Sequence, residues 1–425
     1  MSSSSSAIES VLVENRVFPP AESVVKAARI SGMDGYNALC AAAEKDFEGF
    51  WAKLARENVV WNKPFTRTLD ESNAPFYQWF DDGELNASAN CLDKHVGTPV
   101  ENKTAIIFEA DDGAVTKVTY KELLARVSQF ANALKAQGIK KGDRVLVYMP
   151  MTIEGVIAMQ ACARIGAIHS VVFGGFASGS LATRIDDAKP KLIVSSDAGM
   201  RGGKAVDRNK HLLDEACTLA EFPPEKVLMV DRGLAQGWAR VAGRDVDFAE
   251  LRTQFMDADV PCEWMESTEP SYILYTSGTT GKPKGVQRDT GGYAVALAAS
   301  MKHIFTGGEG ETMFSTSDIG WVVGHSYIIY GPLIAGMATI MYEGTPVRPD
   351  PGIWWQIVEK YKVTVMFSAP TAVRVLKKHD NSYLHKYDLS SLKHLFLAGE
   401  PLDQPTHEWI MGELKLPVID NYWQT

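Results

Sequence analysis

The segment at residues 275–285 combines residue types that suit the binding of phosphate groups. It reads YTSGTTGKPKG, with three glycines, four hydroxyl side chains and two lysines behind an apolar run at 272–275. Glycine lets backbone N–H groups approach a polyphosphate closely, hydroxyl groups add donors, and lysine supplies positive charge. The spacing differs from the G-x-x-x-x-G-K-[ST] phosphate loop, because two glycines are only three residues apart and Pro283 follows Lys282. The composition favours a nucleotide-binding loop over the alternative, a surface turn between a strand and a helix.

Two further motifs follow apolar strands. The stretch 397–401 reads LAGEP, in which a strand runs into a small-residue turn with one carboxylate, and by itself it is as readily a simple turn. The stretch 419–425 reads IDNYWQT and finishes in polar and aromatic groups. A Tyr-Trp pair at this place indicates the wall of a binding site rather than a frayed terminus.

Glycine-flanked aromatic and basic residues mark two more candidate sites. In SDIGWVVGH at 317–325, two glycines surround a tryptophan, which suits the close approach of a flat substrate, while His325 is better explained as a structural histidine. The segment FGGF at 173–176 can cap a strand near a ligand. The segment RGGK at 201–204 offers two cations beside flexible backbone, which fits an anion clamp and a solvated basic turn equally well.

After about residue 104 the sequence pattern alternates between strands and helices, which would position these motifs. Expected strands lie at 104–109, 144–148, 167–173, 192–195, 227–231, 338–342, 364–367 and 394–397, and expected helices at 120–137, 152–164 and 292–304. The TYKE segment at 119–122 fits a capping box, and Gly138 ends the helix that it starts. Strand–helix–strand order implies parallel crossover units and an α/β fold. Residues 1–100 are rich in aromatic side chains with little regular periodicity, and we expect an N-terminal extension packed on a main domain at 101–425.

Composition excludes several classes of protein. The 425 residues are 45% hydrophobic, enough for a large core and more than one folding unit. A net charge of −9 argues against nucleic acid or an anionic membrane surface as a partner. The five scattered cysteines form no C-x-x-C pair, and no secretory signal is readable. The apolar stretch 327–342 is interrupted by glycine and proline, which favours buried sheet and helix over a membrane span. We therefore predict a cytoplasmic protein with small-molecule substrates, and leave its oligomeric state open.

The order and spacing of these motifs over residues 45–425 closely resemble the short-chain acyl-CoA synthetases, the propionyl-CoA and acetyl-CoA synthetase group of the adenylate-forming enzymes. The match also includes GDRV at 142–145, MQACAR at 159–164 and RIDDAKP at 184–190. The resemblance implies the layered α/β large domain of that family and a two-step ligase that uses ATP, Mg²⁺ and CoA. ATP and a short carboxylate would give an acyl-adenylate and pyrophosphate, and CoA would then displace AMP. Because the carboxylate is itself the nucleophile, no Ser-His-Asp arrangement is needed, and none is found.

The resemblance also implies roles for individual residues. The implied ATP-binding residues are Thr276, Ser277, Gly278, Thr279, Thr280, Gly281, Lys282, Gly399, Glu400, Pro401, Asp420, Asn421, Tyr422, Trp423, Gln424 and Thr425. Those with an implied catalytic role are Thr280, Lys282 and Thr425. The implied CoA-binding residues are Arg201, Gly202, Gly203, Lys204 and Val323, and the implied acyl-pocket residues are Trp321, Val322, Ala398 and Trp423.

Two departures from the family pattern concern the substrates. Ala398 stands where acetate-specific relatives commonly have valine, and the smaller side chain favours propionate, with acetate as the alternative. Val323 stands where acetate-type relatives tend to have a CoA-contacting threonine, which leaves this one contact open. The bulky Trp423 would close the pocket and restrict the substrate to a few carbons.

The family residues that follow the Gln-Thr pair are absent from this sequence. They are a magnesium-binding Glu, a ribose-binding Asp, an Arg and the catalytic Lys of a mobile C-terminal domain. We therefore expect the large N-terminal domain of a longer enzyme, weakly active or inactive alone and without metal ligands of its own. Two other readings are a non-catalytic nucleotide- or CoA-binding module and a carrier-loading adenylation domain, the latter disfavoured by the CoA-type motif at 201–204.

Overall fold

Two large β-sheets organise the molecule. The computed structural model describes residues 19–20, 22–206, 208–235, 237–276 and 282–425. The first sheet has the order β12-β11-β8-β6-β7-β14-β15, with β6 at Arg144–Tyr148, β7 at Ile168–Val171, β8 at Leu192–Ser196, β11 at Lys226–Val230, β12 at Asp245–Asp247, β14 at Pro270–Thr276 and β15 at Lys284–Asp289. The second has the order β20-β19-β18-β16-β17-β4-β5, with β4 at Thr104–Ala110, β5 at Val115–Thr119, β16 at Thr312–Ser315, β17 at Ala338–Glu343, β18 at Val365–Ser368, β19 at His394–Ala398 and β20 at Val418–Asn421. Neighbouring strands are parallel except at β15 and β5, each of which closes one edge antiparallel to its neighbour.

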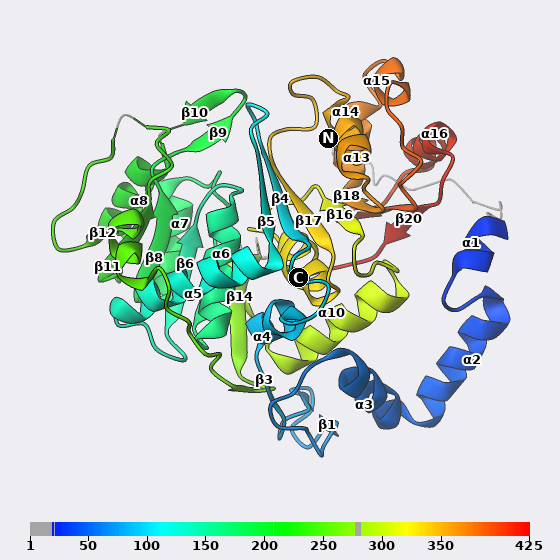
Figure 1. Ribbon diagram of the computed structural model, residues 1–425, viewed down its shortest axis with the longest axis horizontal. Helices are drawn as coiled ribbons and strands as arrows, with labels where there is room; N and C mark the ends of the chain where they lie inside the picture. The colour runs from blue at the N-terminus through cyan, green and yellow to red at the C-terminus, as the bar shows by residue number, and fades with distance from the viewer. Residues whose placement is uncertain (1–18, 21, 207, 236, 277–281) are drawn as a thin grey trace, which may run out of the picture.

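Helices cover both faces of each sheet and make five alternating layers. The central layer contains α4 (Ala87–Cys91), α5 (Tyr120–Ala136), α6 (Ile153–Arg164), α10 (Gly291–His303), the π-helix His325–Tyr330 and α12 (Gly331–Ile334). Figure 1 shows α6 between the first sheet and the strands β4 and β5. The outer face of the first sheet carries α7 (Ser178–Ala188) and α8 (Arg208–Leu219), and that of the second carries α13 (Ile353–Tyr361), α14 (Pro370–Leu376), α15 (Ser382–His385) and α16 (Gln404–Leu414). Alternation along a strand explains the layering: Val145 and Val147 of β6 join the central core, whereas Leu146 and Tyr148 join the outer one. The predicted α/β class is confirmed.

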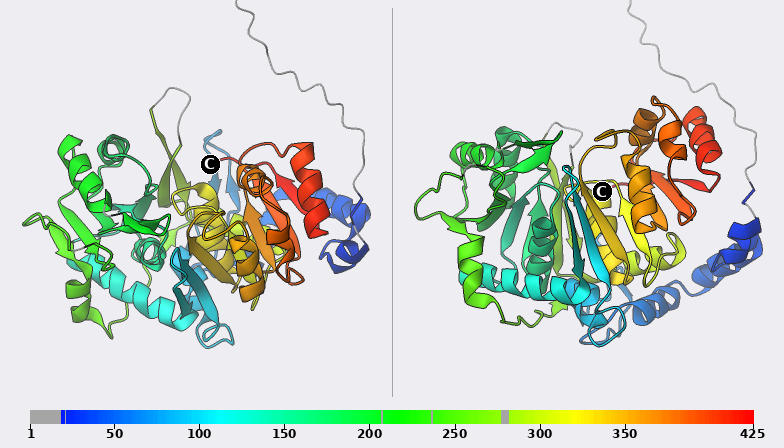
Figure 2. Two further views of the ribbon diagram at one scale, coloured as in Figure 1. Left: turned by 90° about the horizontal axis from the view of Figure 1, so that it is seen from above. Right: turned by 45° about the horizontal axis from the view of Figure 1, so that its top comes forward.

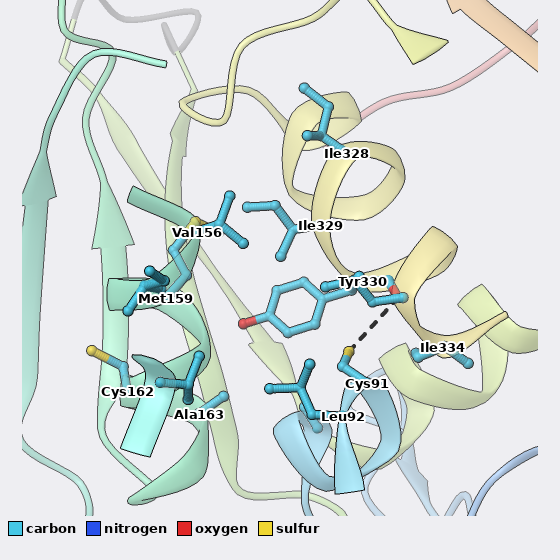
Figure 3. Close-up of a cluster of buried hydrophobic side chains, with 14 of the residues drawn as sticks. Cys91, Leu92, Val156, Met159, Cys162, Ala163, Ile328, Ile329, Tyr330 and Ile334 are labelled. Atoms are coloured by element: carbon cyan, nitrogen blue, oxygen red, sulfur yellow. Dashed lines mark hydrogen bonds between the residues drawn. The ribbon is translucent and has the colours of Figure 1, made fainter. Parts of the chain in front are cut away.

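The central core brings together elements far apart in the chain. Figure 3 shows Tyr330 between Met159 of α6 and Leu92 beside α4, with the Cys91 thiol directed at the Tyr330 carbonyl oxygen. The Sγ–O distance is 3.8 Å. The Tyr330 hydroxyl reaches His169 Nε2 at 2.7 Å, so this polar atom is satisfied inside the core.

The local signals for helices and strands are largely confirmed. The strand at Arg144–Tyr148 has the predicted bounds, α6 begins directly after its N-cap Thr152, and Gly138 beyond α5 has a φ of +82°. Four strands of the two large sheets were missed, namely β5, β12, β15 and β16. Strand β15 is antiparallel to β14, so the segment expected to bind phosphate joins two strands of a hairpin and not a strand to a helix. Its polar sequence KGVQRD suits an edge strand with little burial, which the apolar pattern could not reveal.

The N-terminal part is more regular than expected. It forms α1 (Glu22–Ala27), α2 (Gly32–Lys45) and α3 (Phe47–Asn58), which run along one side of the molecule in Figure 2. The prediction of little periodicity is wrong for α2 and α3, with 14 and 12 residues. Helix α2 buries none of its side chains, whereas α3 contacts α10 and contributes Ala52 and Ala55 to the central core. Remaining short elements are β1 (Leu69–Asp70), β2 (Gln78–Trp79), β3 (Glu84–Leu85), β9 (Gly199–Arg201), β10 (Lys204–Val206), β13 (Met265–Glu266), α9 (Phe248–Arg252) and α11 (Val322–Gly324).

The described helices are also too short or too polar to cross a lipid bilayer. The buried character of 327–342 is confirmed, since this stretch forms most of the π-helix, α12 and most of β17, with its buried side chains divided between the central core and the outer core of the second sheet.

The capping box of α5 gives a stability prediction. Thr119 Oγ1 accepts a hydrogen bond from the Glu122 amide at 3.2 Å, and Glu122 Oε2 accepts from the Thr119 amide at 2.8 Å. We expect Thr119→Ala to lower the free energy of unfolding by about 1 kcal/mol and the melting temperature by about 1–2 °C. Thr119→Ser keeps the hydroxyl group and should melt close to the wild type by calorimetry. Equal losses in both variants would show that the cap does not stabilise this helix.

Candidate functional site

A cavity of about 390 Å³ opens at the carboxyl ends of the strands of the second sheet. It is bounded by the residues that follow β16, β18, β19 and β20, all parallel, so their carboxyl ends meet at one edge. Open α/β sheets bind ligands at this edge, because the loops there converge while the strands hold them rigidly. The predicted site residues that line this cavity are Trp321, Val322, Val323, Ala398, Gly399, Trp423, Gln424 and Thr425.

The structure brings the four predicted acyl-pocket residues together. Ala398 ends β19 with only 4% of its surface exposed, and a larger side chain there would project into the cavity. Trp423 stacks on Phe367, with ring centroids 6.2 Å apart and planes 11° from parallel. It meets Tyr327 edge-on at 4.9 Å. These contacts fix the indole ring as a rigid wall, as the sequence pattern of the last seven residues indicated.

The residue after Ala398 requires glycine for backbone reasons. Gly399 has a φ of +105°, which side chains with a Cβ rarely adopt. The turn that it makes exposes the end of β19 to the cavity.

Other residues of the implied adenine side lie outside the cavity. Glu400 accepts hydrogen bonds from the Thr371 amide at 2.6 Å and from Arg374 Nη1 at 2.9 Å. The bond from the Thr371 hydroxyl and the Arg374 guanidinium lower the pKa of the Glu400 carboxyl, so it stays ionised and ties the turn to α14. Pro401, Asp420, Asn421 and Tyr422 are likewise absent from the lining, and Tyr422 is 91% exposed. Any contact of these side chains with a nucleotide would therefore be made at the open surface beside the cavity.

The segment 275–285, which is expected to bind phosphate, is described only at its two ends. Ser277, Gly278, Thr279, Thr280 and Gly281 lie outside the described residues, so the structure does not place these implied ATP contacts. Thr276 is the last residue of β14, and Lys282 is exposed two residues before β15. The lysine side chain is thus presented to solvent at the neck of the hairpin.

Two residues beneath this hairpin had no role in the sequence interpretation. The Tyr275 hydroxyl donates to Asp187 Oδ2 at 2.6 Å, and the Arg184 guanidinium lies 5.6 Å from the Tyr275 ring centroid and 4.6 Å from that of Phe176. Burial and the bond to Asp187 raise the pKa of Tyr275, which keeps its hydroxyl protonated as a donor. Arg184 and Asp187 lie in α7 and belong to the segment RIDDAKP. This motif was part of the family resemblance, but the sequence did not indicate what its side chains contact. They hold the base of the hairpin against the FGGF segment.

The two glycine-rich segments lie together around a second cavity, of about 280 Å³. Its lining includes Phe173, Gly174 and Gly175 of FGGF, together with Met200 and Gly202 beside the β9–β10 turn. The Gly203 amide at this turn donates to the Asp111 carboxylate. Lys204 is exposed, and the side chain of Arg201 lies outside what the structure describes. The pairing of FGGF with RGGK is therefore observed, although one amide of the expected anion clamp is already bonded to an acid.

A buried ion pair holds this second cavity in place. Arg232 donates to both carboxylate oxygens of Glu343, at 2.7 and 2.6 Å, and the Met200 amide donates to the same carboxylate at 2.9 Å. Asp318 faces this cavity, and burial raises the pKa of its carboxyl to about 6.

Val323 is separated from the other implied CoA residues. It lines the 390 Å³ cavity and not the cavity of FGGF and RGGK. Trp321 stands between the two regions, with its ring centroid 5.8 Å from that of Phe173 and 6.2 Å from that of Phe176. Grouping Val323 with the residues at 201–204 is thus not supported by position.

His325 is buried in the central core, consistent with its structural interpretation. Its Nδ1 lies 3.3 Å from the Trp321 carbonyl oxygen, whereas Nε2 has no hydrogen-bond partner among the described residues. Burial lowers the pKa of His325 to about 4, so the ring is neutral at physiological pH. The expectation of a fully satisfied histidine is therefore only half met. As for metals, no group of three His, Cys, Asp or Glu side chains within the described ranges could hold an ion.

Known proteins are similar in sequence to this chain over most of its length. A family model described as AMP-binding enzyme matches residues 92–425, and one described as acetyl-coenzyme A synthetase N-terminus matches residues 36–91. Propionate–CoA ligase of Escherichia coli (strain K12) is 59% identical over 378 residues, which are 89% of this chain and 60% of that protein. Acetyl-coenzyme A synthetase of Thiobacillus denitrificans (strain ATCC 25259 / T1) is 52% identical over 424 residues, 99% of this chain and 64% of that protein.

The resemblance to short-chain acyl-CoA synthetases is thereby confirmed. The chain spans 60% of one of these relatives and 64% of the other, or roughly three fifths of their length. The matched family model covers the two sheets, the cavity at the carboxyl ends of the second sheet and the segment 275–285. This chain belongs to the AMP-binding enzyme family.

Proposed function

We propose that the chain serves an AMP-forming ligase that activates a short-chain carboxylate, propionate in preference to acetate, and transfers it to CoA. The observation that carries the proposal is the convergence of Trp321, Val322, Ala398 and Trp423 with Thr425 around one 390 Å³ cavity. The cavity is small and mostly apolar beside the expected nucleotide site, as a short acyl group requires. The names of the relatives, propionate–CoA ligase and acetyl-coenzyme A synthetase, support the same reaction.

In the first step a carboxylate oxygen would attack the α-phosphorus of ATP, and the bond to pyrophosphate would break. In the second step the sulfur of CoA would attack the acyl carbon, with loss of the thiol proton and release of AMP. This chain's residues would act by position and charge rather than by covalent chemistry. Lys282 would neutralise phosphate charge, the Thr425 hydroxyl would face the α-phosphate, and Val322 and Trp423 would keep water from the acyl group. We assign Mg²⁺ to ATP itself, and no step to a metal ligand of this chain.

The binding of CoA follows from the second cavity. We propose that CoA runs past FGGF toward the turn at 201–204, where Lys204 is exposed. Trp321 would then separate the thiol end from the acyl group until transfer, because its ring lies between the two cavities.

We further propose a cytoplasmic location, no nucleic-acid partner, and a division into an extension at 1–100 and an adenylation domain at 101–425.

Acetate is the second candidate substrate. Its support is the acetyl-coenzyme A synthetase of Thiobacillus denitrificans, whose match covers 99% of this chain. Against it stands the small side chain of Ala398 in the wall of the acyl cavity, which leaves room for the additional methyl group of propionate.

The size of residue 398 gives a prediction that separates the two acids. Propyl-AMP and ethyl-AMP mimic the propionyl and acetyl adenylates, and their binding can be measured by calorimetry without turnover. A pocket discriminates one methylene by about 1–3 kcal/mol, so we expect propyl-AMP to bind about tenfold more tightly than ethyl-AMP. Ala398→Val should reduce this ratio toward one, whereas Ala369→Gly in the same cavity should keep it. An unchanged ratio in Ala398→Val would mean that Ala398 does not set substrate size.

The alternative from another class is a nucleotide- or CoA-binding module without catalysis. The two differ in one assay, the propionate-dependent exchange of labelled pyrophosphate into ATP. Exchange above the background without propionate supports adenylate formation by this chain. Tight propyl-AMP binding without exchange is the result expected both for the binding module and for a ligase domain that is inactive alone.

A further inference from the structure

A third cavity, of about 470 Å³, lies on the far side of Trp423 from the acyl cavity. Its walls come from the N-terminal part of the chain, from β14 and β15, and from α10, which are far apart in sequence. Trp51 of α3 and Trp79 of β2 line one side, and Tyr272 and Tyr327 line the others. Its size falls within the range of about 300–1,000 Å³ typical of small-ligand sites. The function proposed above makes no use of this space.

The side chain of Trp423 separates this cavity from the acyl cavity. Among the residues that the structure describes, only Trp423 and Val322 belong to the lining of both cavities. The indole ring is held by Phe367 and Tyr327, so the two cavities are distinct while it keeps this position. A ligand of the third cavity would therefore not occupy the place of the acyl group.

A cation marks one side of this cavity. Arg288 of β15 pairs directly with Tyr272 of β14 across the hairpin, and directly opposed strand residues point to the same face. Both side chains line the cavity, and Arg288 has no ion pair among the described residues. Asp289 also lines it, and its carboxylate is bonded by the backbone amides of Gly292 and Tyr293 in the first turn of α10. The Arg288 guanidinium is thus the cation that lines this space.

The hydroxyl group of Tyr272 lies beside this cation. Tyr272 is 1% exposed, and its hydroxyl group makes no hydrogen bond of normal geometry to the described residues, although the side chains of Arg288 and Tyr293 interact with it. Leaving a buried polar group unpaired costs about 1–3 kcal/mol, so a ligand that supplied the partner would recover this energy. The cross-strand position of Arg288 places a cation and this hydroxyl on the same wall.

The remaining lining matches an aromatic body. Trp51 and Trp79 already meet edge-on, with ring centroids 6.1 Å apart, and Tyr272 meets Tyr293 edge-on at 5.1 Å. Such walls contribute apolar contact together with favourable ring–ring geometry. We propose that this third cavity is a binding site for a small aromatic monocarboxylate, whose carboxylate pairs with Arg288 and Tyr272 and whose ring packs on the tryptophans.

The test is calorimetric titration of the whole chain with 3-phenylpropionate, without nucleotide. We expect one site, weakened about tenfold or more in Arg288→Gln, because a charge-assisted hydrogen bond contributes about 1.5–3 kcal/mol. Tyr272→Phe removes only the hydroxyl group and should weaken binding severalfold. The neutral alcohol 3-phenylpropanol should bind at least tenfold more weakly than the acid. Arg252→Gln, a matched change at an exposed arginine of α9, should leave the affinity as in the wild type.

A further variant distinguishes this site from the acyl cavity. Ala398→Leu fills part of the acyl cavity and should not change the affinity for 3-phenylpropionate, and excess propionate should not displace it. The proposal is overturned if no binding is seen at millimolar concentration, or if Arg288→Gln and Tyr272→Phe, shown to melt as the wild type does, bind as tightly. It is also overturned if Ala398→Leu or propionate abolishes binding. None of these outcomes depends on ATP, so they leave the proposed ligase function untouched.

Discussion

Replacing Trp423 by glycine is expected to shift the preference of the acyl site from propionate to acids of about six carbons or more. The indole ring is the wall between a cavity of about 390 Å³ and one of about 470 Å³, and its removal joins them. Each buried methylene contributes about 0.8 kcal/mol, so three additional methylenes contribute roughly 2.4 kcal/mol, more than fiftyfold in affinity. Hexyl-AMP should therefore bind to Trp423→Gly at least fiftyfold more tightly than to the wild type. Propyl-AMP should bind more weakly, because its terminal methyl group loses its contact.

The matched control is Trp423→Phe, which keeps an aromatic wall against Phe367 and Tyr327. It should bind hexyl-AMP as poorly as the wild type. Losing the indole also costs packing energy, of about 3–5 kcal/mol for a large aromatic side chain, so the melting temperature should be measured first. If folded Trp423→Gly does not prefer hexyl-AMP over propyl-AMP, the ring is not the barrier that limits chain length.

Replacing Lys282 by alanine is expected to weaken nucleotide binding by about 1.5–3 kcal/mol, or roughly ten- to 150-fold in the dissociation constant. The side chain is exposed at the neck of the β14–β15 hairpin, where its charge can meet the phosphates of ATP. The same exposure means that it supports little of the core, so the melting temperature without ligand should barely change. Calorimetric titration with ATP gives the first quantity, and thermal unfolding gives the second.

Lys135→Ala is a suitable control, since this lysine is exposed in the last turn of α5. It should bind ATP as the wild type does. Arginine at position 282 keeps the charge and should recover part of the affinity. If Lys282→Ala binds ATP as tightly as the wild type, Lys282 does not contact the phosphates, and the simpler interpretation of the segment as a surface turn is favoured.

The family and much of the local structure could be predicted from residue types and their order. The segment YTSGTTGKPKG, the turn after β19 and the last seven residues carry their chemistry in residue types and order, so they could be recognised without coordinates. The capping box at Thr119 and the stop at Gly138 are local interactions, and both were predicted because the partners lie within a few residues. Strands such as Arg144–Tyr148 were readable because an apolar run between helices has few alternatives in an α/β fold.

Which residues share a cavity depends on how distant segments pack, and this could not be predicted from the sequence. Trp321, Ala398 and Trp423 meet because parallel strands end at one edge of the second sheet, and sequence order does not contain strand order. The same packing places Val323 in the lining of the acyl cavity. It also lets Asp187 accept a hydrogen bond from Tyr275, and it places Tyr272 and Arg288 in the lining of the third cavity, on the other side of Trp423. The edge strand β15 was missed because it is polar and little buried, so it lacks the apolar pattern from which the other strands were predicted. Contacts between distant segments depend on how whole layers pack, so their residues could be named from the sequence but not placed together.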